Sequence, residues 1–474
     1  MKYNNCDIGL IGLGVMGQNL ALNLRDHGYK VVVYNRTFAT TEKFIKQITS
    51  TNPIRGASSV KELCSLLQSP KKILIMVQAG QAVDDMIDQC LPFLAPADII
   101  IDGGNSHYTD SERRYKNLSI QDIFFVGAGI SGGEEGARYG PSIMPGGDRR
   151  AWPHIALYLQ SISAKVEKTN QPCCDWIGEG GAGHYVKMVH NGIEYGDIQI
   201  ISESYHIMRD ILALSTTELQ HVFAVWNQGR LNSYLIEITS KIFAYQDTDG
   251  TPLIEKIRDT AGQKGTGKWT GLSALALSVP VTLIIESVFS RMISANRKQR
   301  IDLHKKYPSP NYFPPKNLKK TLEQLEEALY VAKIISYAQG FMLMKTAAKE
   351  FNWKLNFSTI AGLWRNGCII RSQFLTKIVT AFTKTPRLET LLLDEFFCKE
   401  IKTSLQGLRE IVALSALQGI PTPCLSTALS FFDGSRCIDL PANLLQAQRD
   451  FFGAHTYQRI DKSEKEFFHT QWEK

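Results

Sequence analysis

The sequence has none of the features that mark membrane, secreted or metal-binding proteins. Its 474 residues contain no apolar run of about 18, and the polar amino terminus leads at once into a predicted strand. No CxxC spacing, HExxH motif or EF-hand loop is present, so we expect no metal site. The nine cysteines are scattered, as in proteins whose thiols stay reduced. We therefore expect a cytoplasmic protein without membrane association.

A large excess of one charge sign is also missing. The 53 Lys and Arg residues and the 46 Asp and Glu residues leave a net charge of +7, without a long run of either sign. This balance suits a small acidic substrate better than a nucleic acid, and we expect no nucleic-acid partner. With 44% hydrophobic and 21% charged residues the composition is globular, and the length predicts at least two folded units.

The first part of the chain alternates short β-rich runs with amphipathic helical segments. The runs span residues 8–13, 31–34, 72–77, 99–102 and 123–127. They are nearly all apolar, which is typical of parallel strands covered by helices on both faces. We expect a Rossmann-like, doubly wound α/β domain over residues 1–178.

After residue 178 the pattern changes to long segments with helical periodicity. These segments cover residues 185–208, 217–244, 274–297, 319–350 and 405–418. Because β-rich runs nearly vanish, we expect a large all-α domain over residues 179–440. The polar and aromatic stretch 441–474 predicts a C-terminal tail that docks rather than forms a core.

A glycine motif joins the first strand to the first helix. It comprises Gly12, Leu13, Gly14, Val15, Met16 and Gly17. The first glycine permits a tight turn, the second lets a pyrophosphate approach the backbone, and the third lets helix and strand pack closely. A bare GxGxxG can be a chance turn, but its place between a strand and a helix at the start of an α/β domain favours a dinucleotide site.

The end of the second strand lacks the carboxylate that NAD-binding folds use to hold the ribose 2′-hydroxyl. Asn35, Arg36 and Thr37 stand there instead. An aspartate would repel a 2′-phosphate, whereas the Arg36 guanidinium can pair with it, helped by the Asn35 amide and the Thr37 hydroxyl. We predict NADP rather than NAD as the cofactor. The alternative is a solvated arginine in a loop.

The segment 180–195 carries the most chemical information. On a helix, Lys187, Asn191 and Glu194 fall within a narrow arc, with His190 at its side. One face thus offers a potential base, an amide and a potential acid. The alternative is an ordinary surface face with a lysine and a glutamate.

Two glycines and several apolar residues argue against a merely solvated helix. Gly192 and Gly196 lie in its interior, where each costs about 1 kcal/mol, so we expect another group to approach closely there. Val186, Val189 and Ile193 add apolar surface. We therefore expect this helix to be packed against other elements.

Further glycine-rich or polar segments follow predicted strands at their carboxyl ends. They contain Val77, Gln78 and Ala79, then Asn105, and then Ser131, Gly132 and Gly133. Each can be an ordinary turn, but open α/β sheets bind ligands at this edge, so together they are expected to surround the nicotinamide. Ser131 with the two following amides makes a candidate carboxylate cradle.

The segment 259–269 nearly matches a phosphate-binding P-loop. Trp269 stands where the motif needs a magnesium-binding hydroxyl, and no β-rich run precedes the segment, so we reject that interpretation. Lysines beside glycines, Lys264 and Lys268, still suggest phosphate binding.

Taken together, these motifs resemble the 6-phosphogluconate dehydrogenase (decarboxylating) family over nearly the whole chain. The matching segments are GLIGLGVMGQNLALN, NRT, IIDGGNS, SGGEEGARYGPSIMPGG, GAGHYVKMVHNGIEYGD, AGQKGTGKW and LPANLLQAQRDFFGAHTY. The resemblance implies NADP-dependent oxidation of 6-phosphogluconate at C3 and loss of C1 as carbon dioxide. The product is ribulose 5-phosphate, in the pentose phosphate pathway and gluconate utilization.

The resemblance also implies roles for the helix residues, without a metal. Lys187 matches the general base that takes the proton of the 3-hydroxyl and, once charged, polarises the 3-keto oxygen. Glu194 matches the acid that protonates C1 of the enediol. Residues matching substrate-orienting groups are Asn105, Ser131, Gly132, Gly133, His190 and Asn191.

For the substrate phosphate, the family pattern falls on residues from several segments. They are Tyr195, Lys264, Arg291, Arg449 and His455. The last two lie in the tail and, in this family, reach the active site of the other subunit. The resemblance therefore implies a homodimer with shared sites.

The sequence departs from the family in two places. Gln78 stands where members often have a lysine beside the cofactor, and the chain stops soon after Trp472, where some relatives have a longer tail. Two other interpretations stay open: a general β-hydroxyacid dehydrogenase and a noncatalytic NADP-binding protein. The phosphate-site cations argue against the first, and the presence of Lys187 and Glu194 argues against the second.

Overall fold

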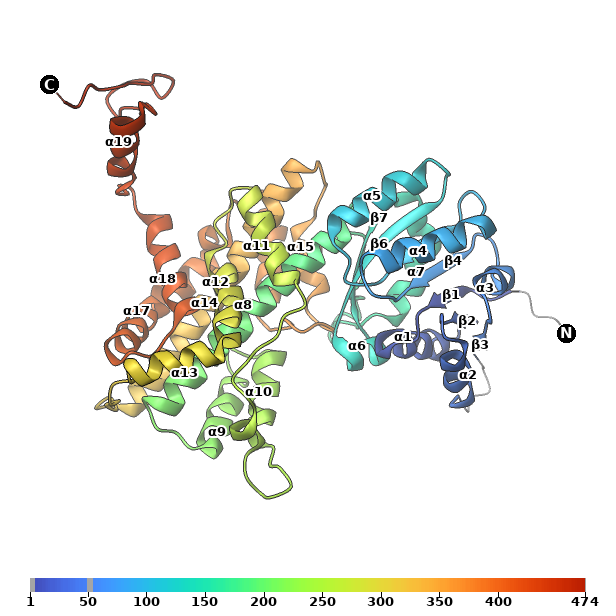
Figure 1. The fold of residues 1–474 in the computed structure, drawn as a ribbon, viewed down its shortest axis with the longest axis horizontal. Helices are drawn as coiled ribbons and strands as arrows, with labels where there is room; N and C mark the ends of the chain where they lie inside the picture. Colours follow the sequence, from blue (N-terminus) through green and yellow to red (C-terminus); the bar gives the residue numbers. More distant parts are fainter. Residues whose placement is uncertain (1–4, 49–53, 474) are drawn as a thin grey trace. The chain divides into compact units, whose positions relative to one another are not determined.

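The structure, a computed structural model, describes residues 5–48 and 54–473. It divides into two compact units, Met1–Thr427 and Ala428–Lys474, which we describe separately. Figure 1 traces the order of the elements along the chain. Across the described residues, none of the helices combines the length and the apolar character needed to cross a bilayer.

The described part of the first unit contains a seven-stranded sheet in the order β3-β2-β1-β4-β5-β6-β7. The strands are β1 (Ile8–Ile11), β2 (Val31–Tyr34), β3 (Arg55–Gly56), β4 (Lys72–Ile75), β5 (Ile99–Asp102), β6 (Phe124–Ser131) and β7 (Ser142–Gly147). All neighbours pair in parallel except β6 and β7, which are antiparallel. The predicted Rossmann-like, doubly wound domain is confirmed.

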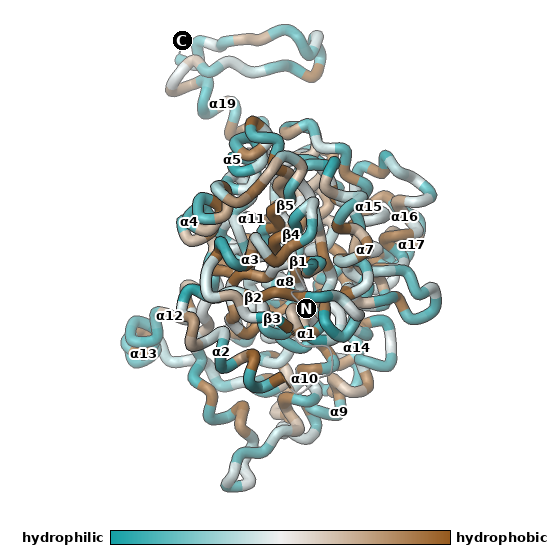
Figure 2. The backbone as a smooth tube through the Cα atoms, turned by 90° about the vertical axis from the view of Figure 1, so that its right-hand side faces the viewer, coloured by the Kyte–Doolittle hydropathy of each residue, from teal (hydrophilic) through white to brown (hydrophobic). Residues whose placement is uncertain are grey.

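Helices cover both faces of this sheet. They are α1 (Val15–Asp26), α2 (Phe38–Lys46), α3 (Val60–Leu66), α4 (Gln81–Cys90), α5 (Tyr108–Ser119), α6 (Gly133–Tyr139) and α7 (Trp152–Ile162). Residues of α1, α6 and α7 join one hydrophobic core, and residues of α3, α4 and α5 join a second core. Successive strand residues point to opposite faces, which explains why nearly every strand position is apolar. Figure 2 shows such hydrophobic stretches at β4 and β5.

The rest of the chain is helical, as predicted. Its helices are α8 (Ala182–Asp210), α9 (Thr216–Trp226), α10 (Tyr234–Ala244), α11 (Thr266–Ala276), α12 (Thr282–Ala295), α13 (Arg297–Lys306), α14 (Leu318–Glu350), α15 (Phe357–Leu363), α16 (Leu375–Lys384), α17 (Glu395–Gln418), α18 (Pro423–Arg436) and α19 (Ala442–Gly453). Two predicted helical segments, 217–244 and 274–297, are each interrupted. In the second, the interruption contains Pro280, which cannot donate a backbone hydrogen bond.

Helix α8 packs directly on the end of the sheet through glycines. A Cβ atom on Gly129 of β6 would collide with the Lys187 side chain, and one on Gly127 would lie 2.7 Å from the His184 ring. On β7, a Cβ on Gly146 would lie 2.5 Å from the backbone nitrogen of Gly183. The missing side chains therefore let the first turns of α8 sit against the backbone of β6 and β7.

The unit Ala428–Lys474 contains helix α19 and a bridge between Tyr457 and Phe468, where the sequence predicted only a docking tail. Asp450 of α19, fully buried, accepts hydrogen bonds from the Thr456 and Thr470 backbone nitrogens, from Trp472 Nε1 and from His469 Nδ1, at 2.9 to 3.0 Å. Burial alone would raise the pKa of Asp450, but these hydrogen bonds lower it to about 2. One carboxylate thus fastens the final strand-like segment to the helix.

Candidate active site

The cofactor edge of the sheet lies where the strand order reverses, between β1 and β4. Gly12 has a φ of +98°, and a Cβ there would lie 2.5 Å from the Met76 carbonyl oxygen. By contrast, a Cβ on Gly14 would meet nothing within 4 Å among the described residues. Gly14 also directly precedes α1. The first turn of α1, which the structure describes in full, has no acidic side chain that would repel an anion. The glycine loop thus leaves open space at a helix amino end, which fits a pyrophosphate.

The Asn35-Arg36-Thr37 triplet lies at the end of β2, as predicted. Asn35 Oδ1 accepts a hydrogen bond from the Leu13 backbone nitrogen at 3.1 Å, which ties the triplet to the glycine loop. Thr37 precedes the first turn of α2. Arg36 is exposed and has no hydrogen bond or ion pair with the described residues, so its guanidinium is available to a 2′-phosphate.

The loops after β4 and β5 touch each other. A Cβ on Gly104 would lie 3.3 Å from the Val77 carbonyl oxygen. Gln78 and Asn105 are both exposed on these loops, and Ala79 is half-buried. The predicted cofactor-lining residues of the two loops are therefore neighbours at one edge of the sheet.

A chain of polar side chains runs from α8 to the end of β6. Asn191 Oδ1 accepts hydrogen bonds from Lys187 Nζ at 2.7 Å and from His190 Nδ1 at 3.1 Å. His190 Nε2 lies 3.3 Å from Ser131 Oγ. Since the Asn191 oxygen can only accept, Nδ1 carries the imidazole proton and Nε2 accepts from the Ser131 hydroxyl. The structure thus joins four of the predicted site residues.

Burial changes the protonation of this chain. It lowers the pKa of Lys187, which is only 7% exposed, although nearby Glu194 works in the opposite direction. Burial, assisted by Lys187, holds the pKa of His190 well below its usual value, so the ring is neutral. Burial also raises the pKa of Glu194, against the influence of Lys187 and Arg291. A lysine and a glutamate are therefore both moved towards their uncharged forms.

Sequence inspection missed Thr266 as a supporting residue. Its hydroxyl oxygen accepts a hydrogen bond from Asn191 Nδ2 at 3.2 Å, so the first residue of α11 fixes the amide that holds Lys187. The signal was present, because Thr266 lies within the AGQKGTGKW segment. A threonine between two glycines does not by itself indicate which side chain it supports, because that depends on how α11 packs against α8.

The two helix glycines have a packing role. A Cβ on Gly192 would lie 2.8 Å from the Thr270 side chain of α11. A Cβ on Gly196 would lie 2.7 Å from Leu283 of α12 and from Ser336 of α14. The expected close approach is thus made by neighbouring helices, which hold α8 in place.

The predicted carboxylate cradle lies at the end of β6. Ser131 is its last residue, Gly132 has a φ of +113° and Gly133 a φ of +62°. A Cβ on Gly132 would lie 2.5 Å from the Gly367 carbonyl oxygen, whereas one on Gly133 would meet nothing within 4 Å in the described part of the chain. Both positions need glycine for their backbone conformation, and the second borders open space.

Three of the predicted phosphate ligands come together around Tyr195. The Arg291 guanidinium carbon lies 3.5 Å from the centre of the Tyr195 ring. The Tyr195 hydroxyl accepts a hydrogen bond from the Lys264 backbone nitrogen at 3.4 Å, and the Lys264 side chain is exposed. One positively charged cluster is thus formed by residues from α8, from α12 and from the segment before α11.

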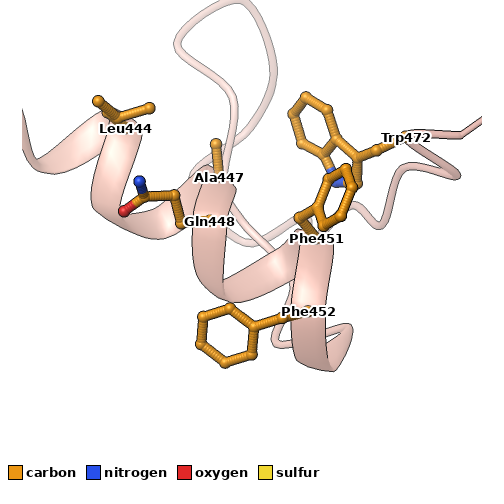
Figure 3. A pocket seen from close by; sticks show the side chains of 6 residues that line it. All are labelled: Leu444, Ala447, Gln448, Phe451, Phe452 and Trp472. Atoms are coloured by element: carbon orange, nitrogen blue, oxygen red, sulfur yellow. The ribbon is translucent and has the colours of Figure 1, made fainter.

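Arg449 and His455 belong to the second unit, and both are exposed. Arg449 NH1 donates to Gln446 Oε1 at 3.1 Å, within α19. Beside them, α19 and the terminal segment form an apolar groove of about 440 Å³ (Figure 3). Its side chains are Leu444, Ala447, Gln448, Phe451, Phe452 and Trp472. Action of the two residues in another subunit stays a prediction.

No cluster of three or more His, Cys, Asp or Glu side chains with metal-binding geometry occurs in residues 5–48 and 54–473. The nine cysteines are free thiols, and seven of them are buried. A Rossmann-like sheet with a glycine loop at its switch point, combined with a buried lysine and a half-buried glutamate, is the arrangement of a nicotinamide-dependent dehydrogenase.

Comparison with known proteins identifies the particular family. Residues 7–178 match the NAD-binding domain of 6-phosphogluconate dehydrogenase, and residues 183–472 match the C-terminal domain of 6-phosphogluconate dehydrogenase. The chain belongs to the 6-phosphogluconate dehydrogenase family.

Similar relatives cover nearly the whole chain. The decarboxylating 6-phosphogluconate dehydrogenase of Homo sapiens is 54% identical, over 98% of this chain and 96% of its own. That of Cunninghamella elegans is 55% identical, with the same coverage. A solved 6-phosphogluconate dehydrogenase from Plasmodium falciparum, studied with its cofactor NADP+ and its substrate 6-phosphogluconate, superposes with a TM-score of 0.95 at 46% identity. That match covers 98% of this chain and 100% of the other.

Proposed function

We propose that this protein oxidises 6-phosphogluconate with NADP and decarboxylates the product to ribulose 5-phosphate, carbon dioxide and NADPH. The observation that carries the proposal is the buried Lys187, hydrogen-bonded to Asn191 within a polar chain that ends at Ser131. The relatives with this activity in their names, at 54% and 55% identity, support it.

The residues at the cofactor edge fit NADP. The open space at Gly14 accepts the pyrophosphate, and the exposed Arg36 pairs with the 2′-phosphate. Gln78, Ala79 and Asn105 flank the nicotinamide end. Bound NADP supplies a hydride acceptor for the substrate carbon that bears the hydroxyl.

Lys187 removes the proton from the 3-hydroxyl of the substrate. Its amine must be neutral for this step, and the lowering of its pKa by burial serves that need. Nζ donates one hydrogen bond to Asn191 Oδ1, which leaves its lone pair to accept the proton. The resulting ammonium then stabilises the oxyanion that develops on O3 as C1 leaves as carbon dioxide. We infer that this charge makes a divalent metal unnecessary.

Glu194 returns a proton to C1 of the enediol. Burial raises the pKa of its carboxyl, which favours the protonated form that can donate. Its Oε2 lies 3.9 Å from His190 Nδ1. Glu194 also follows Lys187 by about two helical turns, so acid and base share one face of α8. Ser131, Gly132 and Gly133 hold the substrate carboxylate, and His190 and Asn191 orient its hydroxyls.

The protein acts as a homodimer in which each tail completes the other subunit's site. The first unit exposes apolar side chains on α11 and α12: Leu272 is 53%, Leu275 71%, Phe289 50% and Ile293 58% exposed. The groove on α19 exposes Phe451 and Phe452 as well. Apolar surfaces of this kind are typical of subunit interfaces. Arg449 and His455 would then join Tyr195, Lys264 and Arg291 at the substrate phosphate.

A turnover assay in a metal chelator tests the proposal. The protein is mixed with 6-phosphogluconate and either NADP or NAD, and nicotinamide absorbance and released carbon dioxide are followed together. We expect equal amounts of NADPH and carbon dioxide, with NADP preferred. Reduction without carbon dioxide, or turnover of unphosphorylated hydroxy acids at a similar rate, would favour a general β-hydroxyacid dehydrogenase. Binding of NADP without reduction would indicate a noncatalytic protein, and a metal requirement would refute the role of the Lys187 charge.

A further inference from the structure

Arg114 of α5 ties together the two loops that flank the nicotinamide end of the proposed cofactor site. The side chain is almost wholly buried, at 2% exposure. Its NH1 donates to Asp102 Oδ2 at 3.1 Å and to Ser106 Oγ at 3.3 Å, on the loop after β5. Its NH2 donates to the Gly80 carbonyl oxygen at 2.9 Å, at the end of the loop after β4.

The remaining donors of Arg114 bind one carboxylate of α4. Nε donates to Asp84 Oδ1 at 2.8 Å, and NH2 donates to Asp84 Oδ2 at 3.1 Å. All five N–H groups of the guanidinium are therefore used. A lysine ammonium has three donors and no planar fork, so it cannot hold these positions at once.

These contacts fix the backbone on both sides of Asn105. Asp102 Oδ1 accepts a hydrogen bond from the Gly104 backbone nitrogen at 3.1 Å, and Asp102 Oδ2 accepts from Ser106 Oγ at 2.6 Å. Because Arg114 also holds Gly80, this buried side chain links the loop that carries the exposed Gln78 to the loop that carries the exposed Asn105.

We propose that Arg114 is a positioning residue that sets the gap between these two loops and thereby orients the nicotinamide for hydride transfer. The inference rests on the proposed function, since it assigns the two loops to the nicotinamide. Arg114 is too deeply buried to touch a ligand at the exposed loop tips, so its effect passes through Gly80, Asp102 and Ser106.

A matched pair of arginines allows a direct test. Arg113 is the neighbouring residue, binds the same Asp84 through NH2 at 2.9 Å, and is 48% exposed, but its ion pairs with the described residues, to Asp84 and Asp110, reach neither loop. Binding of NADP and of adenosine 2′,5′-bisphosphate, which lacks the nicotinamide, is measured by calorimetry for Arg114→Lys and Arg113→Lys. Initial rates provide kcat and KM.

For Arg114→Lys we expect NADP binding to weaken about tenfold and kcat to fall roughly tenfold or more, because a misplaced ring reacts slowly. Binding of adenosine 2′,5′-bisphosphate should change by less than about twofold, since Arg36 and the glycine loop are untouched. Arg113→Lys should leave all three quantities within about twofold. Equal weakening of both ligands would indicate a purely structural residue, and unchanged NADP binding and kcat would also overturn the proposal.

Ser106→Ala serves if Arg114→Lys does not fold. It removes one hydroxyl that accepts a hydrogen bond from the Arg114 guanidinium. NADP binding should therefore weaken about two- to fivefold, while adenosine 2′,5′-bisphosphate binds as before. Unchanged NADP binding in this variant would overturn the proposal. The experiments separate the two proposals. Absence of turnover by the wild-type protein would refute the proposed function, whereas the binding constants for NADP and adenosine 2′,5′-bisphosphate test the role of Arg114 independently of turnover.

Discussion

Two groups of site residues differ in how far their polar atoms are hydrogen-bonded within the protein and in how far they are buried. On α8, Lys187, His190 and Asn191 are hydrogen-bonded to one another, and the lysine and histidine are buried. Arg36 and Lys264, by contrast, are exposed, and Arg36 has no hydrogen bond or ion pair within the described residues. The first group is largely shielded from solvent, and the second is exposed to it.

The difference follows from what each group must do. An acid or a base works only if its pKa lies near the working pH, and burial is the main force that moves the pKa values of Lys187 and Glu194. A phosphate ligand needs permanent charge, which an exposed guanidinium keeps. The two groups should therefore respond differently to substitution, the buried one mainly in kcat and the exposed one mainly in binding.

Replacing Lys187 tests the buried group most severely. Lys187→Met should reduce kcat about a hundredfold to ten-thousandfold, because the base is lost, while NADP binding stays within about twofold. Lys187→Arg keeps the positive charge but cannot act as a base, so it should be nearly as inactive. Initial rates and calorimetry with NADP provide both quantities. Substantial turnover by the arginine variant would mean that charge alone suffices at this position.

Arg449 is a further exposed cation with a predicted role at the substrate phosphate, so its replacement tests the exposed residues as a class. Arg449→Ala should raise the KM for 6-phosphogluconate about tenfold to a hundredfold, since a charge-assisted hydrogen bond to the phosphate is lost. Arg459→Ala is the control, because Arg459 is exposed in the same unit and pairs with Asp461. An unchanged KM in the Arg449 variant would remove the tail from the site.

The same variant tests whether sites are shared between subunits. Mixing Lys187→Met with Arg449→Ala subunits, after dissociation and reassociation, should restore turnover with the wild-type KM. In a mixed dimer one site then carries both defects and the other carries neither. If both residues belonged to the same subunit's site, every site would keep one defect and no turnover with the wild-type KM would return.

Replacing Arg36 tests cofactor choice. Arg36→Ala should weaken NADP binding about tenfold, because one charged partner of the 2′-phosphate is lost, and should leave NAD binding within about twofold. Lys46→Ala, at the other end of α2, is the control for a general loss of positive charge. Calorimetry with both cofactors measures the effect. Equal weakening of NADP and NAD would contradict a role in 2′-phosphate recognition.

Most strands of the sheet could be predicted from the sequence, because each is marked by its own short run of apolar residues. Each of the predicted runs became a strand, since unbroken apolar residues between helices are typical of strands buried on both faces. The antiparallel β7 was missed, because its sequence, SIMPGG, contains a proline and two glycines. What places this segment is its pairing with β6, for example Met144 opposite Gly129, which is a contact between distant parts of the chain.

The site was predictable where residues share one helix and not where they meet through packing. The arc of Lys187, Asn191 and Glu194 follows from helical spacing alone. In the sequence Arg114 is one of several charged residues in its segment, and only the fold shows that its guanidinium joins two loops. The role of Gly129 was equally hidden, because it depends on α8 crossing β6.

A milder change to the polar chain on α8 adds a charge at position 191 but keeps a hydrogen-bond acceptor there. In Asn191→Asp a carboxylate would face Lys187 Nζ, now 2.7 Å from the amide oxygen, and would stabilise the ammonium. The pKa of Lys187, which burial lowers, would then rise.

The sign of the pH effect follows from the form that reacts. Oxidation needs the neutral amine, so activity is lost as pH falls through the pKa of Lys187, and a higher pKa moves that acid limb of kcat/KM to higher pH. At a fixed pH below the limb the rate should fall, and raising the pH should restore it. A profile that is lowered at all pH values without a shift would mean that Asn191 orients the substrate but does not tune the lysine.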